Sequence, residues 1–322
     1  MIVDRHLPRR YRLPGTPREF VFACAELARR RVRTLAPGAA DRFLSCGHGT
    51  GTPLARGLGR VLRAGALEPL VRRLGASGEP ARRELGALLE AALAAGDDST
   101  ALKLAATAAR GPDRRVEKIV SHRYRFVWIC NPKAASRSLI AALRTADPDA
   151  VLVRHRTLEQ VYARYPEARP YFRFAFLRHP FERVRSFYAD KHALARRDRA
   201  AYRWFIKPYP GVRLGMAFAE LCRWLDSPCG ADAFADRHWL SQWRQVADDQ
   251  GRLPDFLGRC ERIEADWRAV SALLGLPATS LPRLNAGDVG LLRASAPDPE
   301  IDALLRRRYA RDYRIGGYGA TS

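Results

Sequence analysis

Three short apolar strands, each followed by a helical stretch, constrain the fold of this chain more than any other feature. The strands are expected at 123–130 (RYRFVWIC), 150–154 (AVLVR) and 171–178 (YFRFAFLR), and the helices at 136–146, 157–168 and 181–197. Strands that alternate with helices at this spacing predict right-handed βαβ units and a parallel sheet. We therefore expect an α/β fold, a three-layer sandwich of the P-loop type around a mainly parallel sheet.

Helices are also predicted on both sides of this region. Residues 17–112 have apolar positions at helical spacing, and the stretch 79–110 predicts two helices, the second capped by Ser99. From residue 200 onward the chain again reads as mostly helical. We expect a helical N-terminal extension over 1–115, to which the sequence assigns no function, and a second domain over 116–322.

The composition indicates a folded and strongly basic protein. Hydrophobic residues make up 47% of the 322 residues, and the formal net charge is +22. Such a surface attracts anions, among them nucleic acid, acidic glycans, anionic lipid and nucleotide cofactors. The six cysteines form no CxxC pair, which favours reduced thiols over a zinc site. Because no apolar run reaches 18 residues, we expect a cytoplasmic protein without a transmembrane segment, with peripheral membrane contact left open.

Polar and cationic residues directly follow the three predicted strands. They are Asn131-Pro132-Lys133, His155 and Arg178-His179. Ligands of an open parallel sheet bind outside the carboxyl ends of its strands, so a lysine, a histidine and an arginine should converge at one edge. We expect the strand that ends before His155 to lie next to the strand that leads to Lys133.

The turn NPKAASRS after the first strand is suited to holding an anion. It supplies backbone N–H groups and a helix N-terminus, Ala134 and Ala135 allow close approach, and Lys133 adds a cation. A nucleoside triphosphatase loop would read GxxxxGK[ST] and would be followed by a strand that ends in an aspartate for magnesium. Neither feature is present here. The turn therefore predicts a site for an anion that needs no metal.

The motifs NPKAASRSL and FLRHPFERVRSFYADK, about 40 residues apart, resemble the two cofactor signatures of the Golgi carbohydrate sulfotransferases and their bacterial relatives. Further segments resemble that family in the same order: RHWLSQ (237–242), FLGRCERIEADW (256–267), LPRLNAG (281–287) and LLRRRYARDYRIGGY. The resemblance covers about 120–318. The chain departs from the family in its Ala-Ala-Ser-Arg turn, where relatives often have glycine or threonine, and in lacking the Golgi membrane anchor.

The resemblance implies that 116–322 is a sulfotransferase domain using 3′-phosphoadenosine 5′-phosphosulfate (PAPS) as co-substrate. The first turn then matches the 5′-phosphosulfate loop, and Arg178 and Ser186 match the 3′-phosphate site. The implied catalytic residues are Lys133, on the leaving phosphate, and His155, as general base, with His238 as its rival. The implied cofactor-binding residues are Pro132, Lys133, Ala134, Ala135, Ser136, Arg137, Ser138, Arg178, Ser186, Arg283 and Asn285.

Two other functions stay open on the sequence. A P-loop kinase of a small molecule would need a metal-binding aspartate after a strand. A basic nucleic-acid-binding protein would interleave basic and aromatic residues on one face, whereas the arginines here are spread along the whole chain, so we expect no nucleic-acid partner. The acceptor of a sulfotransferase, a glycan, glycolipid or natural-product hydroxyl or amine, is not determined by these motifs, and neither is the oligomeric state.

Overall fold

The computed structural model describes residues 67–192, 205–206, 209–277, 280–282 and 298–319. These residues divide into two compact units. The first contains 67–111, 205–206, 209–216 and 227–234, and the second contains the remaining described residues. The first unit ends near the predicted boundary after residue 115 but includes a later segment as well, and 1–115 as a separate domain stays a prediction.

The first unit contains helices α5 (Glu68–Gly75), α6 (Pro80–Ala94) and α7 (Asp98–Arg110), with η7 (Pro228–Gly230) and η8 (Asp232–Phe234). Leucines at helical spacing, such as Leu85 and Leu89, are fully buried between the helices. The cap of α7 differs from the prediction. Asp97, not Ser99, accepts the hydrogen bond from the Thr100 N–H at 3.0 Å, because α7 begins one residue before Ser99.

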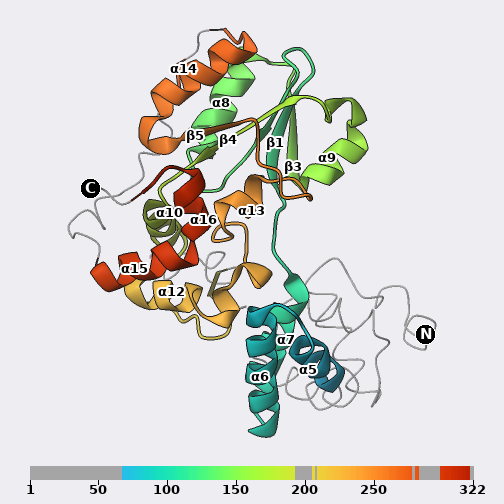
Figure 1. Ribbon diagram of the computed structural model, residues 1–322, viewed down its shortest axis with the longest axis vertical. Helices are drawn as coiled ribbons and strands as arrows, with labels where there is room; N and C mark the ends of the chain where they lie inside the picture. The colour runs from blue at the N-terminus through green and yellow to red at the C-terminus, as the bar shows by residue number, and fades with distance from the viewer. Residues whose placement is uncertain (1–66, 193–204, 207–208, 278–279, 283–297, 320–322) are drawn as a thin grey trace. The chain divides into compact units, whose positions relative to one another are not determined.

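The second unit is built on a five-stranded sheet (Figure 1). Its strands are β1 (Val116–Ser121), β2 (Phe126–Ile129), β3 (Val151–Arg156), β4 (Phe172–Leu177) and β5 (Phe256–Arg259), in the order β3-β1-β2-β4-β5. β2, β4 and β5 pair in parallel, whereas β1 is antiparallel to both β2 and β3. Four of the five strands therefore run in one direction, which agrees with a mainly parallel sheet.

Two strands were missed by the sequence interpretation, and one neighbour relation was wrong. β1 lies between β3 and β2, so the strand that leads to His155 is not next to the strand that leads to Lys133. β1 was missed because Glu117 and Lys118 interrupt its apolar pattern. β5 was missed because it has four residues, one of them Gly258, and lies in a segment that reads as helical.

Helices cover the sheet and position the loops at its carboxyl end. The helix α8 (Ser136–Ala146) has the predicted bounds, and α9 (Leu158–Arg164) and α10 (Pro180–Phe187) begin near the predicted positions. The four residues of β2 are all buried, so both faces of the sheet are covered there. In Figure 1, α8 and α14 (Ile263–Leu274) lie together beside the strands.

The unit also contains α12 (Phe218–Leu225), α13 (Gln242–Val246), α15 (Pro299–Arg308) and α16 (Ala310–Ile315). Its short helices are η3 (Pro166–Ala168), η4 (Tyr188–His192) and η9 (Cys260–Arg262). Residues 235–247 belong to the region that was predicted to be mostly helical, but only the end of this stretch is an α-helix, α13. In the part of the chain that the structure describes, no helix is long and apolar enough to span a bilayer.

Candidate active site at the carboxyl ends of β2 and β4

The turn after β2 has a backbone conformation that suits anion binding. Lys133 and Ala135 adopt positive φ angles of 72° and 54°, and the Ala134 N–H donates to the Asn131 carbonyl at 3.1 Å. Left-handed residues in such a turn direct successive N–H groups into a concave nest that attracts anions. Ala135 is also the N-cap of α8, and no side chain caps that end. The first turn of α8 therefore adds N–H groups and the positive end of a helix dipole.

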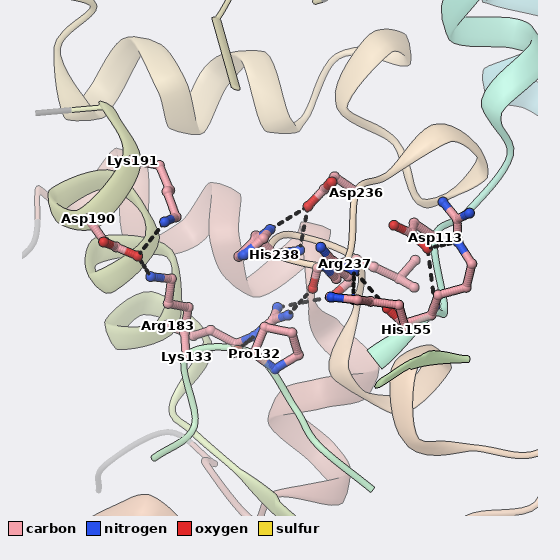
Figure 2. Close-up of polar contacts among 12 residues, drawn as sticks. Asp113, Pro132, Lys133, His155, Arg183, Asp190, Lys191, Asp236, Arg237 and His238 are labelled. Carbon is pink, nitrogen blue, oxygen red and sulfur yellow. Dashed lines mark hydrogen bonds and ion pairs between the residues drawn. The ribbon is translucent and has the colours of Figure 1, made fainter. Parts of the chain in front are cut away.

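The ammonium of Lys133 lies against a carboxylate from another element. It forms an ion pair with Asp190 in η4, and Asp190 also contacts the Lys191 ammonium at 3.1 Å (Figure 2). The Lys133 side chain is 13% exposed, and burial lowers its pKa, although the hydrogen bond to Asp190 acts in the opposite direction. Lys133 is thus a largely buried cation on this turn.

Arg178 reaches the same turn from the next strand. It directly follows β4, and its Nη1 donates to the Lys133 carbonyl at 3.2 Å. Gln242 fixes the backbone here, because its Oε1 accepts from the Arg178 N–H at 2.9 Å and from Asn131 Nδ2 at 2.7 Å. Lys133 and Arg178 are therefore brought together at the carboxyl ends of β2 and β4, as the sequence predicted.

Arg183 joins the turn to a distant segment of the chain. It lies on α10 and is 1% exposed. Its guanidinium donates to three backbone carbonyls, those of Pro132 at 3.0 Å, Leu240 at 3.0 Å and Arg237 at 3.1 Å. Pro132 precedes Lys133 and Arg237 precedes His238. The Arg183 guanidinium therefore holds the backbone next to Lys133 close to the backbone next to His238, because it donates to both.

His238 has the arrangement expected of a general base. Its Nδ1 lies 2.6 Å from the Asp236 Oδ1, and its ring stacks on Phe187 with centroids 6.1 Å apart. Burial acts to raise the pKa of Asp236, but the hydrogen bonds and charge of His238, together with the charge of Arg237, lower it on balance. A carboxylate only accepts hydrogen bonds, so Nδ1 carries the hydrogen and the lone pair of the neutral ring is on Nε2.

His155 lies on the other side of His238 from Lys133 in the view of Figure 2. It is an exposed residue of β3 with a φ of 51°, a backbone conformation that is strained for histidine. Its Nδ1 is 2.9 Å from Nη1 of Arg237 and 3.9 Å from Glu117. Since a guanidinium only donates, Nδ1 accepts and the hydrogen of neutral His155 is on Nε2.

The remaining predicted residues fall into three groups. The residues predicted to bind the 5′-phosphosulfate share the turn and the first helical turn of α8, where Ala134 and Ser138 are buried and Arg137 is exposed. Ser186 is half-buried on α10, six residues after its first residue. Arg283 and Asn285 lie outside the described residues.

The later motifs have structural roles in the site. The buried Asp312 carboxylate accepts from the Gln242 N–H at 2.8 Å and from the Trp243 N–H at 2.9 Å. Glu261 accepts from the His179 N–H at 2.7 Å and from the Tyr318 hydroxyl at 2.9 Å. These contacts attach the C-terminal segment to the ends of β4 and β5.

Four residues of the site were not assigned from the sequence: Asp190, Arg183, Asp236 and Gln242. Asp236 had a local signal, because it lies two residues before His238 and also accepts the His238 N–H at 2.9 Å. The other three act over separations of 51 to 111 residues, for which the sequence pattern carries no signal.

The described residues contain no cluster of three or more histidine, cysteine or acidic residues placed to hold a metal ion.

Comparison with known proteins found a match to the family model described as the sulfotransferase family, over residues 116–319. No curated protein and no solved structure matched. The match spans more than half of the chain and contains the turn after β2, Arg178, Arg183 and His238, so this chain belongs to the sulfotransferase family.

Proposed function

We propose that this protein transfers the sulfuryl group of PAPS to a hydroxyl or amine of a glycan, glycolipid or natural product. The observation that carries the proposal is a pair of cations, from two neighbouring strands, that meet at one turn. Lys133 belongs to the turn, and the Arg178 guanidinium binds the carbonyl of Lys133 from the neighbouring parallel strand. Two phosphates on one nucleoside need two such cationic positions.

The residues present fit the two phosphates of this donor. The left-handed turn and the uncapped α8 N-terminus suit the 5′-phosphosulfate, with Lys133 beside it. Arg178 and Ser186 suit the 3′-phosphate, because one follows β4 and the other is half-buried on the helix that begins two residues later. A three-layer sandwich of the P-loop type accords with this use of the turn.

The reaction needs a cation beside the leaving phosphate and a base beside the acceptor, on opposite sides of the sulfur. The acceptor oxygen forms a bond to sulfur while the bond from sulfur to the 5′-phosphate oxygen breaks, and that oxygen keeps the electron pair. Lys133 stabilises the charge that develops on the phosphate. The acceptor proton passes to a histidine, for which we favour Nε2 of His238.

His238 is favoured over His155 by its hydrogen bonds. The Asp236 carboxylate orients His238 and makes Nε2 its basic nitrogen. His155 instead accepts from Arg237, and the Glu117 carboxylate, 3.9 Å from its Nδ1, lies beyond hydrogen-bond distance. His155 resembles the catalytic histidine of some family members and has a strained backbone, so it stays the alternative. A contact between His155 and the acceptor is compatible with either assignment.

Binding and turnover test the proposal separately. The product 3′-phosphoadenosine 5′-phosphate should raise the melting temperature without added metal, and adenosine monophosphate should raise it much less. Incubation with sulfur-labelled PAPS and a panel of sugars, lipids and phenols should then label one acceptor class. Equal binding of the two nucleotides would remove the 3′-phosphate site. A requirement for ATP and magnesium would favour a kinase.

A further inference from the structure

The carboxylate of Asp190 lies where an anionic ligand of Lys133 is expected. It forms an ion pair with the Lys133 ammonium, which is largely buried, while Asp190 itself is 44% exposed (Figure 2). The Asp190 carboxylate therefore occupies a position beside the Lys133 ammonium that a phosphate oxygen could take. A phosphate oxygen and a carboxylate oxygen compete for an ammonium with similar geometry, because both are charged acceptors.

The position of Asp190 is built into the fold. It belongs to the π-helical turn η4, which continues α10 directly beyond Ser186. Aromatic contacts anchor this turn, since the buried His192 ring packs on Phe187 at 5.4 Å and stacks on Tyr188 at 5.9 Å. Single π-helical turns within α-helices are frequent at functional sites because they redirect side chains.

The charges around the pair favour an exchange of partners. Burial acts to raise the pKa of Asp190, but the hydrogen bonds and charges of Lys133 and Lys191 outweigh it and keep the carboxyl ionised. Lys191 lies 3.1 Å from the same carboxylate. If Lys133 turns to another anion, Asp190 keeps a cationic partner in Lys191 and no uncompensated charge is left.

We propose that Asp190 is a positioning residue that holds Lys133 in the donor-free enzyme and competes with the donor's phosphate for its ammonium. This inference rests on the proposed function. It predicts that donor binding includes the transfer of Lys133 from Asp190 to the phosphate. The contact keeps Lys133 charged between turnovers at the cost of donor affinity.

Titration calorimetry with 3′-phosphoadenosine 5′-phosphate tests the competition. Asp190→Asn should bind this nucleotide about tenfold more tightly than the parent, since one charge-assisted contact no longer has to be broken. Glu159→Gln is the matched control. It also removes one carboxylate charge, from a residue on α9 that forms an exposed ion pair with Arg169, and this variant should bind the nucleotide like the parent. Equal or weaker binding by Asp190→Asn would overturn the inference.

A double-mutant cycle with Lys133→Met separates competition from a general field effect. In the Lys133→Met background, Asp190→Asn should no longer change the affinity. A tenfold gain that persists without the Lys133 ammonium would overturn the inference, because it would come from the loss of a negative charge alone. If the nucleotide binds neither the parent nor any variant, the proposed function fails together with the inference. If it binds the parent and Asp190→Asn equally, only the inference fails.

The pH dependence of kcat/KM gives a readout that a purely structural role would not change. Burial lowers the pKa of Lys133, Lys191 and Arg137 lower it further, and Asp190 raises it. Removing the Asp190 charge should therefore move the alkaline limb of kcat/KM to lower pH, because Lys133 loses its proton more readily. An unchanged alkaline limb in an active Asp190→Asn enzyme would contradict the assignment.

Discussion

His238 donates from Nδ1 to the Asp236 carboxylate, with 2.6 Å between Nδ1 and Oδ1. This contact orients the ring and directs its basic nitrogen away from the aspartate. We expect His238→Ala to lower kcat by about 10²–10⁴-fold, the usual range for the loss of a general base. Binding of 3′-phosphoadenosine 5′-phosphate should change little. Steady-state kinetics with an alkyl alcohol or sugar acceptor provide the measurement.

His155→Ala is the companion variant for this assignment. His155 is exposed and contacts Arg237, so its removal should act mainly on the acceptor KM. If His155→Ala loses turnover while a folded His238→Ala remains active, the base is His155.

Lys133→Met should reduce turnover more than it reduces donor affinity. The charge of Lys133 matters most when the leaving phosphate gains negative charge, so its loss should lower kcat by about 10²–10³-fold. Lys133→Arg keeps the charge and should retain part of the activity. Single-turnover rates with saturating donor would show the effect directly, and an unchanged rate would refute a catalytic role for this lysine.

Arg178→Ala should weaken donor binding and the preference for a 3′-phosphate. A charge-assisted contact contributes about 1.5–3 kcal/mol, which corresponds to about 10–100-fold in affinity. The affinity for adenosine monophosphate, which lacks the 3′-phosphate, should fall much less. Calorimetry with both nucleotides measures the ratio. A similar loss for both would mean that Arg178 acts only through its hydrogen bond to the Lys133 carbonyl.

Lys118 should give the stability of the protein a distinct pH dependence. It is 1% exposed in β1, its Nζ donates to the Val116 carbonyl at 3.2 Å and to the Arg156 carbonyl, and burial lowers its pKa to about 7. Between this pKa and the ordinary value of 10.5, the unfolded chain binds a proton that the folded chain does not. The contribution of Lys118 to the free energy of unfolding therefore rises with pH over this window and is level above it.

Urea unfolding of the parent and Lys118→Met from pH 6.5 to 9 tests this relation. The difference between their free energies of unfolding should move in favour of the parent by up to about 1.4 kcal/mol per pH unit above pH 7. A difference that does not depend on pH would show that Lys118 keeps its proton in the folded state.

Gly258→Ala should destabilise the sheet. A Cβ at Gly258 would lie 2.5 Å from Cε1 of Phe176, its partner across the β4–β5 ladder, and Phe176 is 1% exposed. Overpacking of this kind costs about 1–3 kcal/mol of unfolding free energy, measurable by urea denaturation. The same change in a Phe176→Leu background should cost less, because the ring is gone.

The local units that position the site could be predicted from the sequence. The buried strand, small-residue turn and helix over 126–146 follow from apolar patterning and from residues that allow close approach. The sequence also predicted that Lys133 and Arg178 follow strands of one sheet and converge at its edge, and this is confirmed, although it did not predict that the two strands are neighbours. Their roles in catalysis and cofactor binding stay predictions.

Only the tertiary structure decided which distant groups meet at the turn. β1 separates β3 from β2, which removed the adjacency expected for His155, and no local pattern could indicate an antiparallel strand that contains a buried lysine. The Lys133–Asp190 pair joins residues 57 positions apart, and Asp312 binds the Gln242 N–H across 70 positions. Periodicity and turn chemistry act over a few residues, whereas such contacts depend on how packed elements converge, so the sequence determined the turn and the fold determined its partners.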